Sequence, residues 1–124
     1  GDKNSDLLYK RLQDEGRAIV DRLPIYKNVH TDLSKNENFQ RFKTEGADCV
    51  LFTSSSTVHN YVAATESLDF KNGLKPKFGS IGVKTSETFR QHNLPIAFES
   101  PKANLDNFVV ETLSYFRNNK EQIK

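Results

Sequence analysis

The chain has 124 residues, of which 18 are Lys or Arg and 16 are Asp or Glu, which gives a formal net charge of +2. A charge this balanced does not by itself indicate a nucleic-acid-binding protein, and no apolar run approaches the about 20 residues that a membrane-spanning helix needs. The single cysteine, Cys49, excludes a disulfide framework within the chain and a metal cluster built on cysteines.

The first 26 residues are predicted to form one helix and one strand. Leu7, Leu8 and Leu12 repeat at helical spacing and predict a helix that Gly16 ends. The β-rich run 18–26 that follows predicts a strand, and a proline near its end places it at a strand terminus or a sheet edge. Because the sequence starts with glycine and contains no methionine, we expect a piece of a longer protein.

Residues 27–124 are predicted to form an α/β lobe. After a polar connection, a helix is expected from Ser34 to Gly46, ahead of three strand–turn–helix units. The strands are predicted at 48–52, 77–81 and 94–98, and Asn93 is expected to end the helix of the second unit. Three such units predict a parallel sheet with right-handed crossovers, built in three layers.

Small polar residues follow the strands of this predicted sheet. Thr53, Ser54 and Ser55 come after the first strand, Gly82, Lys84 and Thr85 after the second, and the segment 99–104 after the third. Ligands of parallel α/β sheets bind beyond the carboxyl ends of the strands. Each of these turns also opens a helix, whose free N–H groups and positive dipole end attract anions. The sequence therefore predicts a site for a polyanion at this edge.

A simpler interpretation applies to each hydroxyl taken alone. Ser and Thr are among the best N-cap residues, so capping is the better interpretation of any single turn. Four consecutive hydroxyls at Thr53–Ser56 exceed what one cap requires. This turn is therefore the strongest candidate for a binding loop.

Several motifs of known catalytic sites are absent. The chain has no P-loop, no dinucleotide fingerprint and no nucleophile elbow. His30, His59 and His92 lack the spacing of metal ligands and are interpreted as surface or packing residues. Cys49 begins an apolar strand and is interpreted as a small hydrophobic residue. We expect no metal site.

Tyr26 is a candidate catalytic residue. It lies at the end of a predicted strand, just before the polar connection. It could pack at a sheet edge, or it could point its phenol into a cleft between two lobes and donate a proton. A reference pKa of about 10 keeps a phenol protonated near neutral pH, which suits an acid better than a base.

Taken in order, these motifs resemble the C-terminal half of the uroporphyrinogen-III synthase family. The segment 23–26 resembles the family's crossover between lobes, and Ala47–Val58 resembles its strand and serine-rich loop. Ser80–Ser86 resembles its Ile-Gly-x-x-Thr turn, with Val83 where many members have proline. Glu99–Leu105 resembles the start of its closing helix.

The resemblance implies one half of a two-lobed fold, with a flavodoxin-like α/β lobe at 27–124. Residues 1–26 would lead to the crossover between the lobes. The active site of the family lies in the cleft, so this chain would have a partner, the missing N-terminal half of the same protein. We therefore expect the chain alone to be inactive, and we expect a cytoplasmic location.

The resemblance also implies a lyase of tetrapyrrole biosynthesis. The family cyclises hydroxymethylbilane, a linear tetrapyrrole with acetate and propionate groups, and inverts ring D through a spiro intermediate. It uses no metal and no cofactor. By position, Tyr26 would assist departure of the hydroxyl as water. The substrate carboxylates would be bound by Thr53, Ser54, Ser55, Gly82, Lys84 and Thr85.

Two other functions remain open at this point. The same helix N-termini would suit a non-catalytic, flavodoxin-like module that binds an anionic small ligand. If every hydroxyl is only a cap, the chain would instead be a structural or partner-binding domain. Stabilisation by an anionic tetrapyrrole would argue against the structural domain, since ligands stabilise the state that they bind.

Overall fold

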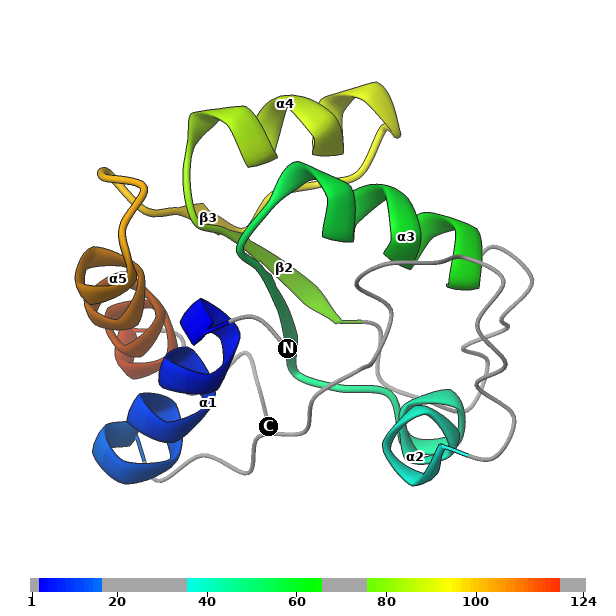
Figure 1. The fold of residues 1–124 in the computed structure, drawn as a ribbon, viewed down its shortest axis with the longest axis horizontal. Helices are drawn as coiled ribbons and strands as arrows, with labels where there is room; N and C mark the ends of the chain where they lie inside the picture. Colours follow the sequence, from blue (N-terminus) through cyan, green and yellow to red (C-terminus); the bar gives the residue numbers. More distant parts are fainter. Residues whose placement is uncertain (1–2, 17–35, 66–75, 119–124) are drawn as a thin grey trace.

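A computed structural model of the chain describes residues 3–16, 36–65 and 76–118 (Figure 1). The predicted strand at 18–26, with Tyr26, lies outside the described residues. So does the boundary between residues 26 and 27, and the division into two parts stays a prediction. No helix in the described ranges is long and apolar enough to cross a membrane.

The described residues form helices and short strands in the order α1, α2, β1, α3, β2, α4, β3, α5. The helices are α1 (Lys3–Gly16), α2 (Glu37–Glu45), α3 (Ser55–Thr65), α4 (Val83–Gln91) and α5 (Leu105–Asn118). The strands are β1 (Cys49–Phe52), β2 (Lys77–Ser80) and β3 (Phe98–Glu99). They form one parallel sheet in the order β1-β2-β3. The predicted α/β fold class and the parallel sheet are confirmed.

The helices cover both faces of the sheet, so the structure has three layers. α3 and α4 lie side by side on one face, whereas α1 and α5 lie on the other (Figure 1). This arrangement follows from the strand order, because successive crossovers in one direction place their helices on the same face. The N-termini of α3 and α4 are therefore neighbours.

Aromatic rings fill the core between the sheet and the helices α2, α3 and α4. Phe52 lies at the centre, in edge-to-face contact with Tyr61, Phe78 and Phe89 at centroid distances of 5.2, 5.9 and 5.0 Å. Such pairs contribute about 0.5–1.5 kcal/mol each beyond burial of their area. Phe39 of α2 belongs to the same cluster.

The opposite face carries a second core, under α1 and α5. Leu8 and Leu12 of α1 pack with Phe98, Phe108 and Val109. Their spacing of four residues along α1 places both leucines on one stripe of the helix. α1 is therefore an integral part of this layer, although it is distant in sequence from α5.

The start of α2 differs from the sequence-based expectation. The helix begins at Glu37 instead of Ser34. Asn36 is the N-cap, since its Oδ1 accepts a hydrogen bond from the N–H of Phe39 at 2.9 Å. At the other end, Gly46 adopts a φ of 72°, and its N–H is bonded to the Phe42 carbonyl at 2.9 Å. Gly46 therefore closes the helix as the sequence predicts.

The third strand is much shorter than the predicted span 94–98. The N–H of Leu94 is bonded to the Phe89 carbonyl at 2.9 Å, so this residue still belongs to the helix end. Pairing with β2 begins where the N–H of Ala97 reaches the Phe78 carbonyl at 2.8 Å. Asn93, directly before Leu94, has a φ of 56° and ends the helix as predicted.

The aromatic core generates the first prediction. Phe89 is completely buried among the rings of Phe52 and Phe78. We expect Phe89→Ala to lower the free energy of unfolding by about 3–5 kcal/mol, because it removes a ring and leaves a cavity. Urea denaturation followed by circular dichroism measures this change. Val110→Ala is the control, since Val110 is 62% exposed, and a loss as large in this variant would contradict the prediction.

Candidate functional site

The carboxyl ends of the three strands lie level with one another. In the parallel register, Phe52 pairs with Ser80, and Ser80 pairs with Glu99. The loops that follow therefore leave the sheet at one edge. Across the first two of these loops, the hydroxyl of Ser55 donates to the carbonyl of Lys84 at 3.2 Å. The structure thus brings together two of the predicted binding residues, which are 29 positions apart in sequence.

Ser54 serves as the cap of α3. Its Oγ accepts from the N–H of Thr57 at 3.4 Å and donates to the Thr57 hydroxyl at 3.2 Å. The Thr57 hydroxyl donates in turn to the Ser54 carbonyl at 2.7 Å. Capping, the simpler interpretation of this turn, thus applies to Ser54. Thr53 and Ser55 beside it are half-buried.

The N-terminus of α4 has no side-chain cap. Its N-cap is Gly82, which has extended backbone and no side chain to accept a hydrogen bond. Lys84 in the first turn is exposed, whereas Thr85 is buried, with 4% of its surface accessible. A ligand would therefore meet the ammonium group of Lys84 and the backbone N–H groups of this turn, not the Thr85 hydroxyl.

Buried serines hold the Gly82 turn in place. The hydroxyl of Ser80 donates to the Gly82 carbonyl at 2.8 Å and accepts from the hydroxyl of Ser86 at 2.8 Å. The N–H of Gly82 is directed back to the same Ser80 oxygen at 3.3 Å. Both serines are fully buried. The sequence-based prediction of the site missed Ser80, although a serine that ends a strand directly before Ile-Gly was a signal for it.

The loop after β3 leaves no room for a side chain at Gly82. A Cβ built on Gly82 would lie 2.7 Å from the Cβ of Ala103, which is closer than two such atoms can approach. The loops after β2 and β3 therefore touch at this point. Within the loop after β3, the hydroxyl of buried Ser100 donates to the Lys102 carbonyl at 2.7 Å.

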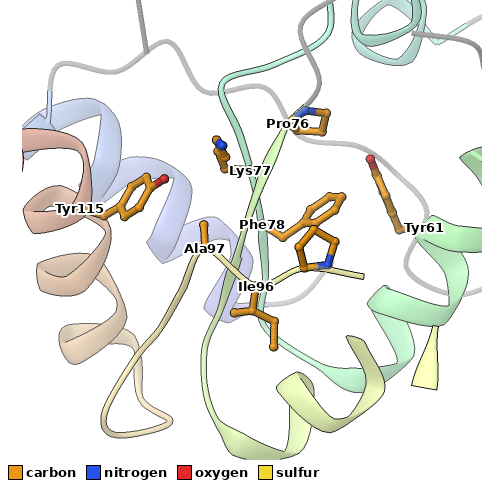
Figure 2. A pocket seen from close by; sticks show the side chains of 8 residues that line it. Tyr61, Pro76, Lys77, Phe78, Ile96, Ala97 and Tyr115 are labelled. Carbon is orange, nitrogen blue, oxygen red and sulfur yellow. The ribbon is translucent and has the colours of Figure 1, made fainter. Parts of the chain in front are cut away.

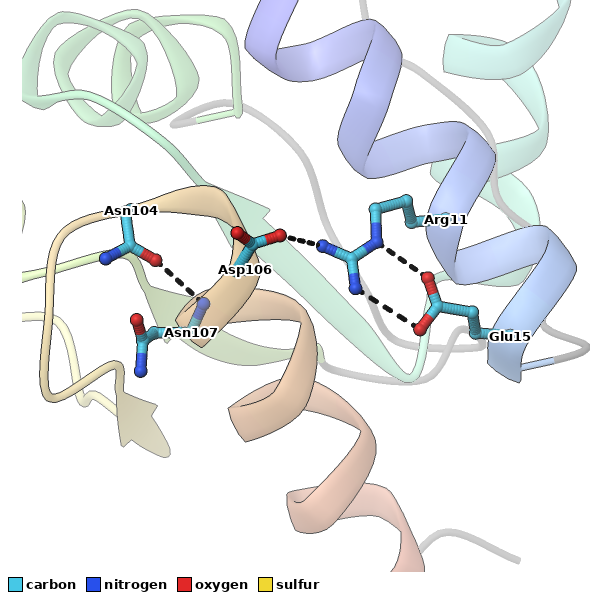
Figure 3. A network of polar contacts seen from close by, with 5 residues as sticks. All are labelled: Arg11, Glu15, Asn104, Asp106 and Asn107. Carbon is cyan, nitrogen blue, oxygen red and sulfur yellow. Dashed lines mark hydrogen bonds and ion pairs between the residues drawn. The ribbon is translucent and has the colours of Figure 1, made fainter.

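The N-terminus of α5 differs from that of α4. The Oδ1 of Asn104 accepts from the N–H of Asn107 at 2.8 Å and so caps the helix (Figure 3). Asp106 in the first turn forms an ion pair with Arg11 of α1 at 2.5 Å. Arg11 also pairs with Glu15 at 2.6 Å, and this hydrogen bond lowers the pKa of Glu15. The third predicted anion-binding end thus already has its own carboxylate.

Charge distinguishes the helix ends further. An acidic residue lies in the first turn of α1, α2 and α5, namely Asp6, Glu37 and Asp106. Neither α3 nor α4 has one. Acidic residues near an N-terminus stabilise a helix through its dipole. Among the helices of the described ranges, only α3 and α4, whose N-termini are neighbours at the carboxyl ends of the strands, have no acidic residue in the first turn.

A pocket of about 560 Å³ lies at the opposite end of the strands from the candidate site, next to the N-terminal end of β2. Tyr61 of α3 and Tyr115 of α5 flank it from the two faces of the sheet (Figure 2). Its remaining lining residues are Pro76, Lys77, Phe78, Pro95, Ile96 and Ala97. None of the predicted site residues lines this pocket, so it is separate from the candidate site.

Cys49 does not have the properties of a nucleophile. Burial raises the pKa of its thiol to about 12, with a further contribution from the nearby charge of Asp48. The thiol therefore stays protonated near neutral pH, whereas the reactive form of cysteine is the thiolate. The described residues contain no group of three or more His, Cys, Asp or Glu that could hold a metal ion.

A family model described as uroporphyrinogen-III synthase HemD matches residues 1–109 of the chain. The match covers the candidate site described above and the segment with Tyr26. No match was found among curated proteins or among solved structures.

The contact between Gly82 and Ala103 leads to a prediction. We expect Gly82→Ala to lower the free energy of unfolding by about 1–3 kcal/mol, since the added methyl group overpacks the two loops. The double variant G82A/A103G restores the space and should recover most of this loss. Urea denaturation of the two variants measures both effects, and equal instability of both would show that the contact is not the cause.

A third prediction concerns pH. In the unfolded chain the thiol of Cys49 titrates near its ordinary value of 9.0, but in the folded chain only near 12. Between these values the unfolded state has lost the proton that the folded state retains, so stability falls as pH rises above 9. The slope for one group is about 1.4 kcal/mol per pH unit. In urea denaturation at pH 8 to 10, Cys49→Ala should show a shallower fall than the unmodified chain. Equal slopes would contradict this assignment.

Proposed function

Because the chain belongs to the uroporphyrinogen-III synthase family, we propose that it provides the substrate-binding edge of an enzyme that converts hydroxymethylbilane to uroporphyrinogen III. One observation carries the proposal beyond family membership. The adjacent N-termini of α3 and α4 have no acidic residue in their first turns, and α4 has no side-chain cap. The acetate and propionate groups of the substrate would supply the missing negative charge.

Lys84 strengthens this assignment. A lysine in the first turn of a helix lies at the positive end of the dipole, which is unfavourable by about 0.3–1 kcal/mol. Its position therefore does not serve the stability of α4. A bound carboxylate would reverse the effect, because it would interact with the ammonium group, the dipole and the backbone N–H groups together.

The loop after β1 would provide the second contact. Ser55 already joins this loop to Lys84 through its hydroxyl, which leaves the lone pairs of its oxygen and the first N–H groups of α3 for other partners. We propose that Thr53 and Ser55 bind a second carboxylate of the same substrate. Ser54, as the cap of α3, would hold this loop in shape, and Thr85 would contribute its backbone N–H.

The proposed chemistry requires little acid–base strength. Tyr26 would donate its phenolic proton to the hydroxyl of the substrate, which then leaves as water. Ring D would invert through the spiro intermediate before the macrocycle closes. The main contribution of the protein is to hold the flexible chain in the reactive conformation, which can supply a large part of a rate enhancement.

A complete site would require a second lobe. We propose that an N-terminal half of the same protein supplies it, so that the substrate is bound in the cleft between the two. A binding module without activity is the alternative, since it would use the same helix ends. The two functions are distinguished by the isomer that forms from hydroxymethylbilane: a synthase gives type III, whereas a binding module leaves the uncatalysed type I product unchanged.

An isomer assay tests the proposal. Hydroxymethylbilane is generated in situ and closes without enzyme to the type I isomer. We expect the chain joined to its N-terminal half to give the type III isomer, and the chain alone to give type I. The products are oxidised and the porphyrins separated by chromatography. Type I alone from a folded, complete protein would reject the synthase and favour the binding module.

A matched pair of lysine variants tests the site within this assay. We expect Lys84→Gln to raise KM about threefold to tenfold with little change in kcat, since it removes one charge from the carboxylate site. Lys43→Gln on α2 is the control, because Lys43 is also exposed but lies in the last turn of its helix. The same rise in KM for both variants would indicate a general charge effect.

A further inference from the structure

Two of the three histidines meet on the surface of the molecule. His59 lies in α3, and His92 is the C-cap of α4. The Nδ1 of His59 is 2.8 Å from the Nε2 of His92, and the ring centroids are 4.9 Å apart. His59 is exposed and His92 is half-buried, so solvent reaches the pair. Nothing in the proposed reaction uses it.

The spacing of the two nitrogens matches that of imidazoles on one metal ion. With metal–nitrogen bonds of about 2.05 Å, two ligand nitrogens lie about 2.9 Å apart at a right angle and about 3.3 Å apart at the tetrahedral angle. The observed 2.8 Å is close to the right-angle value. Right angles between neighbouring ligands are typical of the tetragonal sites of Cu²⁺ and Ni²⁺.

Metal binding would need only a local change in the rings. In the hydrogen-bonded pair one of the two nitrogens carries a proton, whereas a metal needs a lone pair from both. The proton can move through solvent to the other nitrogen of the same ring, which leaves both imidazoles neutral. The hydrogen bond between the rings has to break, and both rings have to tilt, because their two nitrogens now face each other and must both point at one ion.

The helices hold the pair ready for a ligand. α3 and α4 pack against each other, and Ser55 and Lys84 join their first turns. The backbone N–H of His92 is bonded to the carbonyls of Thr88 and Phe89 at 3.3 and 3.1 Å. Two side chains that the backbone already holds as neighbours lose less conformational entropy when they bind one ligand than two distant ones would. His92 also lies at the C-terminus of a helix, where the dipole favours a cation.

We propose that His59 and His92 form a binding site for a divalent cation of tetragonal geometry, with Cu²⁺ as the ion bound most strongly. Water would complete the coordination, since the described residues provide no third ligand. Cu²⁺ stands highest in the affinity order of divalent first-row metals for nitrogen ligands. The bound ion would connect α3 to α4 at a position away from their N-termini and so stabilise the layer that carries the candidate site.

Titration of the chain with Cu²⁺ tests this proposal. We expect one ion per chain, an electron paramagnetic resonance spectrum with two imidazole nitrogens, and a thermal midpoint that rises with Cu²⁺ concentration. His59→Gln and His92→Gln should each weaken binding at least tenfold and remove one of the two nitrogens from the spectrum. Glutamine suits the exposed helix position 59, and circular dichroism without metal checks the fold of each variant.

The third histidine provides the control. His30→Gln removes the same chemical group at a distant position in sequence, and we expect it to bind Cu²⁺ as the unmodified chain does. Binding that is unchanged in both His59→Gln and His92→Gln would overturn the proposal. So would an equal loss in His30→Gln, because it would indicate unspecific binding to single histidines.

Discussion

The parallel pairing of β1 with β2 determines where the candidate site lies. Four successive residue pairs, from Cys49 with Lys77 to Phe52 with Ser80, bring the two strands to an end at the same level. Because both strands run in the same direction, α3 and α4 both begin at this edge and lie next to each other. A shift of the register would separate Ser55 from Lys84 and would also turn the apolar side chains of β1 away from their cores.

Alternation along the short strands divides the core between the two faces. Val50 and Phe52 contribute to the aromatic core under α3 and α4, whereas Cys49 and Leu51 contribute to the core under α1 and α5. Gly79 makes this possible in β2, since a Cβ there would lie 2.4 Å from the ring of Phe98. The glycine leaves room for a large ring on a sheet only a few residues long, and that ring in turn stacks on Tyr115.

Local sequence patterns predicted most of the helices and strands accurately, but they did not predict the contacts between segments that are distant in sequence. The strand at 49–52 follows directly from a short apolar run, and Asn93 ends α4 through its own left-handed backbone. The predicted strand at 94–98 was too long because hydrogen bonds to Phe89 and Phe78, not residue type, decide where pairing starts. The pair of His59 and His92 was not foreseeable, since only the packing of α3 on α4 joins residues 33 positions apart.

The candidate site illustrates the same distinction. The sequence predicted an anion site at all three strand ends, with the turn at Thr53–Ser56 as the strongest candidate, because each end opens a helix with small polar residues. The structure separates them by what already occupies each end: Asn104 and Asp106 satisfy α5, Ser54 caps α3, and α4 has only Gly82. The support for Gly82 comes from inside the protein, where Ser80 and Ser86 bond to each other and to the backbone, and no buried side-chain nitrogen or oxygen of the described residues lacks a partner. A helix end that is rigidly held, positively charged and without a carboxylate of its own is prepared for a negative charge from outside the chain.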